Sequence, residues 1–105
     1  MLNGHFAEHW MDDGKPAGGV SSGRGFTISW QNGPLGSGSD RKEPNGSFVE
    51  DVIQAVLGRL RFYQQSAFAC QSNAEAIDHL QSAAAALDSR TKERESRGVE
   101  GTHAK

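Results

Sequence analysis

The chain has 105 residues, of which 35% are hydrophobic and 13 are glycines, and its formal net charge is −2. A chain of this length forms at most one domain with a modest core, so association with further copies would help its stability. No block of Lys and Arg stands clear of acidic residues, which argues against DNA or long RNA as a partner but leaves room for a small nucleotide held by a few arginines.

Cysteine usage and hydropathy indicate the cellular compartment of the protein. The single cysteine, Cys70, excludes an internal disulfide framework and is typical of a reducing cytosol. The first ten residues have neither a basic region nor an apolar run, so we expect no signal peptide. No segment approaches the length of a membrane span.

The first 24 residues are polar and rich in glycine. Residues 5–11 could form a short strand, with Phe6 and Trp10 as its apolar residues. We interpret the "DDGKPAGG" that follows as a turn. Within these residues, "HFAEH" matches a zinc-peptidase pattern, but that chemistry needs both histidines on one helical face, and no helical stripe is present.

Residues 25–31 carry the clearest strand pattern, because Phe26, Ile28 and Trp30 alternate with polar residues. No second strand follows Asn32-Gly33, so we expect this strand to pair with residues 5–11 or with another subunit. Residues 32–46 then form a long glycine-rich loop. This loop is either a flexible linker or a bare backbone that closes over a ligand, with main-chain amides close to a phosphate.

Residues 47–98 predict two helices joined by a short link, and therefore an antiparallel hairpin. Ser47 and Glu50 form a capping box at the start of the first helix. The second helix begins near Phe68 or Ser72 and ends before Gly98. The apolar positions follow helical spacing, at Val49, Val52, Ile53, Val56, Leu57, Leu60 and Tyr63 in the first helix and at Ile77, Leu80, Ala84 and Leu87 in the second.

Three kinds of residue depart from this simple pattern. Phe62 points away from the apolar stripe of its helix, with Arg59 near it, which predicts either a helix covered on both sides or an interface or ligand wall. Asn73 lies on the apolar stripe, as a helix cap or as an amide that recognises a base or ribose. Arg90 and Arg94 belong to a charge-paired helix end, yet arginine is also the preferred side chain for bidentate phosphate contacts.

No set of residues combines a nucleophile with an oriented base, and "GPLGSGSD" lacks the lysine of a P-loop, so we interpret the chain as a binder and not an enzyme. Cys70 has no adjacent base. We expect no catalytic residue, no metal site and no cofactor.

Three stretches, "GFTISWQNGP", "PNGSFVEDV" and "SRTKERESRGVEGTH", resemble small phage-encoded proteins, and the similarity covers about residues 20–103. The group is identified as the first-described family of Thoeris anti-defence sponges. That resemblance implies a protein that traps the cyclic ADP-ribose isomer made by bacterial TIR-domain proteins without cleaving it. Some relatives also sequester cyclic oligonucleotides of the CBASS system at separate sites in a hexamer.

The resemblance also implies the ligand-binding residues. In that family the pocket is formed by an aromatic residue of the first helix, an asparagine at the start of the second, and arginines. The matching positions are Phe62 or Tyr63, Asn73, Arg90 and, in the loop before the first helix, Arg41. We add Trp30 and Arg94 as further candidates, because Trp30 lies at one end of the glycine loop and Arg94 is one of the arginines in the last turns of the second helix.

Helix geometry gives an independent expectation. Asn73 and Arg90 are 17 residues apart, since 90 − 73 = 17, which corresponds to about 25 Å along a helix. One cyclic ADP-ribose cannot reach both from a single chain, so a shared pocket needs an antiparallel partner.

The predicted fold class is therefore α+β, an oligomeric antiparallel two-helix hairpin with a small antiparallel N-terminal sheet. One domain spans residues 1–105, with strands and loop in 1–46, the hairpin in 47–98 and a tail in 99–105. The predicted partners are a cyclic nucleotide immune signal and further copies of the chain, as a dimer or hexamer, in the cytoplasm of an infected bacterium. The alternative function is a phage protein–protein interaction module with no small-molecule ligand.

Overall fold

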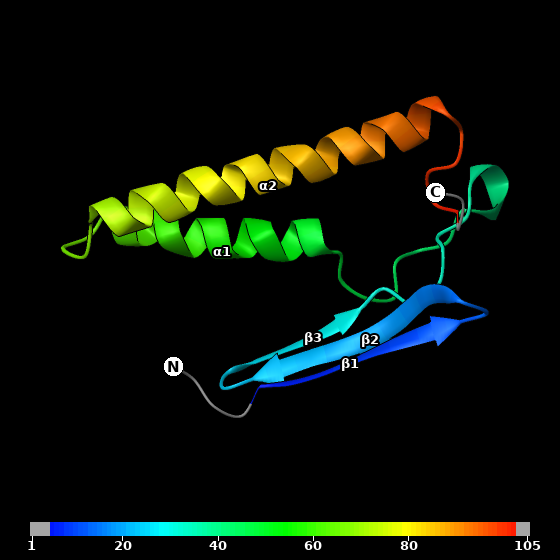
Figure 1. Cartoon of the computed structure of the whole chain (residues 1–105), viewed down its shortest axis with the longest axis horizontal. Helices are drawn as coiled ribbons and strands as arrows, with labels where there is room; N and C mark the ends of the chain where they lie inside the picture. Colours follow the sequence, from blue (N-terminus) through cyan, green and yellow to red (C-terminus); the bar gives the residue numbers. More distant parts are fainter. Residues whose placement is uncertain (1–4, 103–105) are drawn as a thin grey trace. The chain divides into compact units, whose positions relative to one another are not determined.

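The computed structural model describes residues 5–102. Its class is α+β, as predicted, with a three-stranded antiparallel sheet followed by two helices (Figure 1). Contacts divide the chain into two compact units: the described residues up to Phe48 and from Arg97 onward, and the span Val49–Ser96. Residues 103–105 of the predicted tail lie outside the described residues.

The sheet is a simple meander in the order β1-β2-β3, formed by Phe6–Asp12, Lys15–Gly23 and Phe26–Trp30. The first turn consists of Asp13 and Gly14, both with positive φ (52° and 76°), as tight two-residue hairpins favour. The second turn is Arg24-Gly25, in which Gly25 has a φ of 80°. The strand in the "HFAEH" region confirms that its histidines do not lie on one helical face.

The partner of β3 is β2, so the expectation that β3 pairs with residues 5–11 or with another subunit is wrong. The interpretation of "DDGKPAGG" as a turn is also wrong beyond Asp13-Gly14, because β2 begins at Lys15. Its glycines are needed for close packing: a Cβ at Gly19 would lie 2.5 Å from the carbonyl oxygen of Glu8. Glycine is disfavoured in isolated strands, and this hid the central strand in the sequence.

The glycine-rich loop after β3 is closed at its base. The Ser47 amide donates to the Ser29 carbonyl (2.8 Å), and the Gln31 amide donates to the Ser47 carbonyl (3.0 Å). The Asn45 side chain binds the backbone of Asn32 through both its oxygen and its nitrogen (2.8 and 3.0 Å). Asn32-Gly33 therefore opens a closed loop, and as expected it does not form a hairpin turn.

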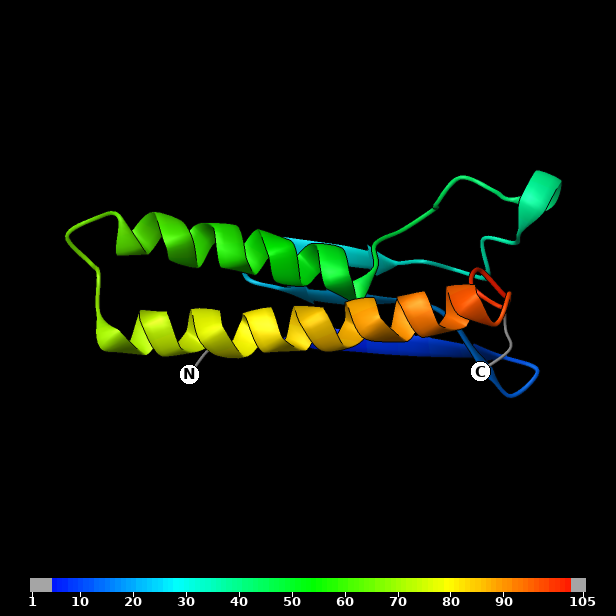
Figure 2. The ribbon, with the colours of Figure 1, turned by 90° about the horizontal axis from the view of Figure 1, so that it is seen from above.

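The predicted antiparallel helical hairpin is confirmed, with α1 at Val49–Gln64 and α2 at Gln71–Ser96 (Figure 2). α1 begins at Val49, so Ser47 is not the residue directly before the helix, as the predicted capping box required, and its backbone amide is bonded to β3 instead. The link is held by Gln64, which accepts from the Cys70 amide (2.9 Å) and donates to the Cys70 carbonyl (3.2 Å). Gly98, with a φ of 74°, follows the end of α2 as the spacing predicted.

The apolar stripe of α1 is only partly covered within one chain. Leu57 is 1% exposed, whereas Val49 and Val56 on the same stripe remain 49% and 44% exposed. The α2 positions Ile77 and Leu80 are half-buried. Within residues 5–102, neither helix is long and apolar enough to span a membrane.

Candidate functional site

Two aromatic rings and an arginine meet near the end of α1. The guanidinium carbon of Arg59 lies 5.2 Å from the Phe62 ring centroid and 5.0 Å from that of Tyr63. Arg59 also donates a hydrogen bond from Nε to the Tyr63 hydroxyl (3.2 Å). Such i, i+3 and i, i+4 contacts are expected on one helix face. This aromatic–arginine cluster, Arg59–Phe62–Tyr63, presents a cation and π faces together.

The cluster shows how the two aromatic candidates differ. Phe62 is 57% exposed, while Tyr63 is half-buried and its hydroxyl is already bonded to Arg59. Phe62 therefore offers the accessible ring face, and Tyr63 helps to hold the arginine. The sequence noted Arg59 only as a neighbour of Phe62 and did not include it among the candidates, although its spacing to both aromatics was the available signal.

Asn73 occupies the third position of α2 and is half-buried. Its Nδ2 donates to the carbonyl oxygen of Phe68 (3.1 Å), so it is not the cap residue that precedes the helix. Among residues 5–102, none donates a hydrogen bond to its Oδ1. The amide thus keeps an acceptor, at the end of the hairpin that also carries Phe62 and Tyr63.

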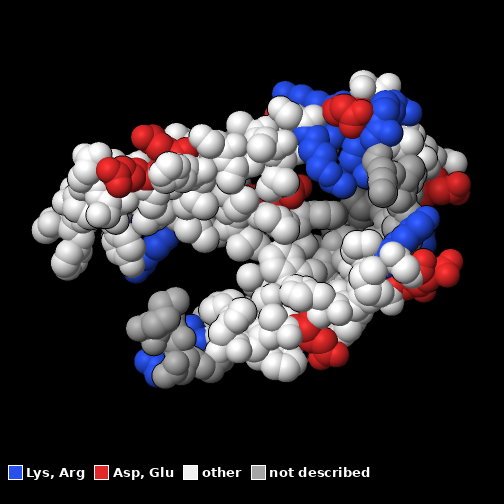
Figure 3. Space-filling view, viewed as in Figure 1, with Lys and Arg blue, Asp and Glu red and all other residues white. Residues whose placement is uncertain are grey.

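The arginine candidates of α2 lie at the opposite end of the hairpin. All the cations of this helix fall within its last seven residues, and Figure 3 shows Lys and Arg gathered over this part of α2. Arg90 is exposed, and Arg94 is buried, with 8% of its surface exposed. Lys92 forms an ion pair with Asp88 (3.1 Å), one helical turn away. Asn73 and Arg90 thus lie on one continuous helix, about 25 Å apart along its axis.

Trp30 and Arg41 belong to the unit that contains the sheet. Trp30 is half-buried, and its indole N–H donates to the Ser21 hydroxyl of β2 (2.9 Å). This bond ties the Trp30 side chain to the neighbouring strand of the sheet. The guanidinium of Arg41 binds both carboxylate oxygens of Glu100 (2.5 and 3.2 Å) and the carbonyl oxygen of Gly36 (3.3 Å). No pattern in the sequence connects Glu100 with Arg41.

Phe62, Tyr63 and Asn73 thus lie at the link end of the hairpin, and Arg90 and Arg94 lie at the other end. Trp30 and Arg41 have their own partners in the sheet unit. Among the described residues, no three His, Cys, Asp or Glu side chains gather as a metal site would require.

Comparison with known proteins places this arrangement in a family. Residues 24–92 match the family model described as "Acb2/Tad1, hairpin domain", which takes in the strand β3, the loop, α1 and most of α2. The chain is also similar to "Thoeris anti-defense 1" of Bacillus phage SBSphiJ7, with 44% identity over 84 residues. That match covers 80% of this chain and 56% of the relative, so the chain spans a little over half of the relative's length. The family match extends over more than half of the residues, and the chain therefore belongs to the Acb2/Tad1 hairpin-domain family.

Proposed function

We propose that this chain is a phage anti-defence protein that binds a cyclic ADP-ribose isomer and withholds it from Thoeris immunity without cleaving it. Its place of action in this proposal is the cytoplasm of the infected bacterium. The family membership and the printed name of the Bacillus phage relative support the anti-defence role.

The observation that carries the proposal is the exposed aromatic–arginine cluster at the same end of the hairpin as Asn73. The face of Phe62 can stack on a purine, and stacked bases are commonly bound in this way. The Oδ1 of Asn73 can accept a hydrogen bond from a base or a ribose. Together they suit the nucleoside part of the ligand.

The phosphate part of the ligand needs a cation, and Arg90 suits it because a guanidinium binds phosphate oxygens in pairs. Arg90 lies about 25 Å along α2 from Asn73, so it must come from a second copy of the chain. An antiparallel partner would bring the cationic end of its α2 to the aromatic end of the first hairpin. Two equivalent pockets would result from a twofold axis.

The uncovered apolar side chains of α1 support this second copy. Val49 and Val56 lie on the predicted core stripe but remain about half exposed. A partner helix would bury them and add stability to a core in which, among residues 5–102, Leu57 is the one large side chain that is fully buried. The same proposal extends to an assembly larger than a dimer and to cyclic oligonucleotides as further ligands.

The decisive experiment is to incubate the protein with the products of a TIR-domain enzyme, remove unbound molecules, denature the protein by heat and analyse what it releases by mass spectrometry. We expect the protein to release an intact cyclic ADP-ribose isomer, at about one molecule for each proposed pocket. A cleaved product would show a hydrolase, and release of no nucleotide would contradict the binding proposal.

The alternative function, a protein–protein interaction module, is supported by exposed apolar side chains on the sheet. Phe6, Trp10 and Met11 of β1 and Phe26 of β3 are 43–64% exposed, and large apolar side chains left exposed are one mark of a surface that binds a partner protein. Thermal unfolding distinguishes the two functions: a ligand at 100 times its Kd stabilises the folded state by about 2.7 kcal/mol. No upward shift of Tm with cyclic ADP-ribose isomers would favour the interaction module.

A further inference from the structure

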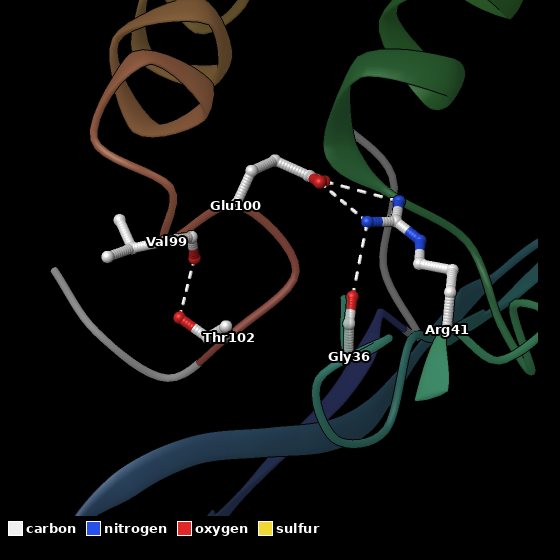
Figure 4. A network of polar contacts seen from close by, with 5 residues as sticks. All are labelled: Gly36, Arg41, Val99, Glu100 and Thr102. Atoms are coloured by element: carbon white, nitrogen blue, oxygen red, sulfur yellow. Dashed lines mark hydrogen bonds and ion pairs between the residues drawn. The ribbon is translucent and has the colours of Figure 1, made fainter. Parts of the chain in front are cut away.

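Arg41 holds a two-oxygen anion from its own chain. Its Nη1 and Nη2 donate to the two carboxylate oxygens of Glu100, at 2.5 and 3.2 Å (Figure 4). The two residues are far apart in the sequence but belong to the same compact unit. A guanidinium binds carboxylate and phosphate with the same planar fork, so the position of Glu100 is one that a phosphate group can occupy.

The backbone around this ion pair is shaped to bring the two segments together. The Gly36 amide donates to the Gly101 carbonyl (2.6 Å), and the Gly36 carbonyl accepts from Arg41 (3.3 Å). A Cβ at Gly101 would lie 2.7 Å from Nη1 of Arg41, so a side chain there would collide with the guanidinium. Thr102 closes a turn back to the Val99 carbonyl, and Glu100 lies within this turn (Figure 4).

We propose that Glu100 is a positioning residue for Arg41: its carboxylate takes the place of a ligand phosphate and ties the glycine loop to the segment after α2 until a phosphate displaces it. This inference rests on the proposed function, and it adds Arg41 to Arg90 as a second cation for the phosphate groups of the ligand. The inference adds two points: the ligand must replace the carboxylate of Glu100, and the contact between the loop and the segment 99–102 becomes weaker when it does.

The exposure of the pair makes the exchange feasible. The Arg41 and Glu100 side chains are 42% and 29% exposed, so the pair is partly screened by water. Ion pairs in such positions contribute little to stability, so replacing one costs little. A pyrophosphate carries more charge than one carboxylate and can displace it. Loss of the ion pair then weakens the contact between the loop and the segment 99–102, which the hydrogen bond from the Gly36 amide to the Gly101 carbonyl still joins.

The test is an NMR titration of the full chain with inorganic pyrophosphate at fixed ionic strength, followed on the Gly36 amide. We expect Glu100→Gln to lower the Kd for pyrophosphate by about two- to fivefold, the factor that corresponds to losing one exposed competing ion pair. Glu100→Asp, which keeps the carboxylate, should return the Kd toward the wild-type value. Arg41→Ala should abolish the effect of Glu100→Gln.

Glu43→Gln is the matched control, since it removes one negative charge from the same loop and Glu43 forms no ion pair within residues 5–102. Its Kd should change less than that of Glu100→Gln. A Kd in Glu100→Gln that is equal to or higher than that of Glu43→Gln would overturn the inference, because it would show that pyrophosphate does not displace Glu100 from Arg41 when it binds. Absence of pyrophosphate binding to the wild type would overturn it as well.

Hydrogen exchange gives a second readout that needs no tight binding. The Gly36 amide is protected by its bond to Gly101, so Glu100→Gln should speed its exchange without ligand, and pyrophosphate should do the same in the wild type. Unchanged exchange in both cases would contradict a weaker contact between the loop and the segment 99–102. Neither measurement uses a TIR-enzyme product, so failure to capture a cyclic ADP-ribose isomer would be a separate result.

Discussion

Asn73 and Arg90 lie on one uninterrupted helix, 17 residues apart, which sets them about 25 Å from each other along its axis. Because α2 is continuous between these residues, their separation in the sequence determines their distance along the helix axis. Because the ligand class we propose is much shorter than this distance, joint contact by both residues demands two chains. The first two predictions follow from this relationship.

We expect the protein to be at least a dimer in solution. One chain has a mass of 11.3 kDa, and sedimentation equilibrium should give a multiple of this value at micromolar concentration. The physical reason is the uncovered stripe of α1, where Val49 and Val56 are exposed in a single chain. A strictly monomeric protein in solution would contradict a pocket shared between two chains.

Mixed oligomers test which chain supplies each residue. Asn73→Ala and Arg90→Ala should each weaken binding of the cyclic ADP-ribose isomer when tested alone. Co-expressed in equal amounts, they should recover about a quarter of the binding sites, because half of the dimers are mixed and each mixed dimer has one intact pocket. If the two residues acted within one chain, the mixture would recover no sites.

Phe62→Ala should weaken binding of the cyclic ADP-ribose isomer and leave stability nearly unchanged. Phe62 is 57% exposed, so its removal costs little packing, whereas loss of one base–aromatic stack costs about 1–3 kcal/mol. Titration calorimetry measures the affinity, and urea unfolding measures the stability.

The matched control for Phe62→Ala is Phe68→Ala. Phe68 is an aromatic residue of the link that is 74% exposed and has no ring contact within residues 5–102. Equal losses of affinity in the two variants would show that the aromatic–arginine cluster has no special role.

Leu57→Ala should destabilise the fold by about 2–5 kcal/mol, because it empties a fully buried site. Leu57 is 1% exposed and lies in the middle of α1. Gln54→Ala is the control, since Gln54 is exposed on the same helix and its change should stay within about 0.5 kcal/mol. Similar urea midpoints for the two variants would contradict the assigned core.

Two glycines after α2 allow a matched test of the contact with the loop. Gly98 and Gly101 have φ values of 74° and 80°, so alanine at either position adopts an unfavourable backbone conformation at about 1–2 kcal/mol. A Cβ at Gly98 meets nothing within 4 Å, whereas one at Gly101 would collide with the Gly36 carbonyl and with Arg41. Gly101→Ala should therefore cost more in urea unfolding than Gly98→Ala. Equal costs would show that segment 99–102 does not rest on the loop.

The two helices could be predicted from the sequence because their information is local. Apolar residues at helical spacing, acidic residues in the first turn of α1 and Gly98 after α2 all act within a few residues of one another. The strand β3 was equally readable, since Phe26, Ile28 and Trp30 alternate with polar residues. The continuity of α2, and with it the distance between Asn73 and Arg90, also follows from the sequence alone.

The tertiary structure decided what pairs with what. β2 contains glycine, serine and proline, which disfavour a strand locally, and it forms because hydrogen bonds from β1 and β3 satisfy its backbone on both sides. The same holds for Arg41, whose sequence neighbours say nothing of Glu100. The glycine-rich stretch after Trp30 is therefore neither a missing strand nor a free linker: it is a loop closed at its base by Asn45 and Ser47 and held beyond it by Glu100. Contacts between residues far apart in the chain depend on how the backbone closes, and no local pattern carries that information.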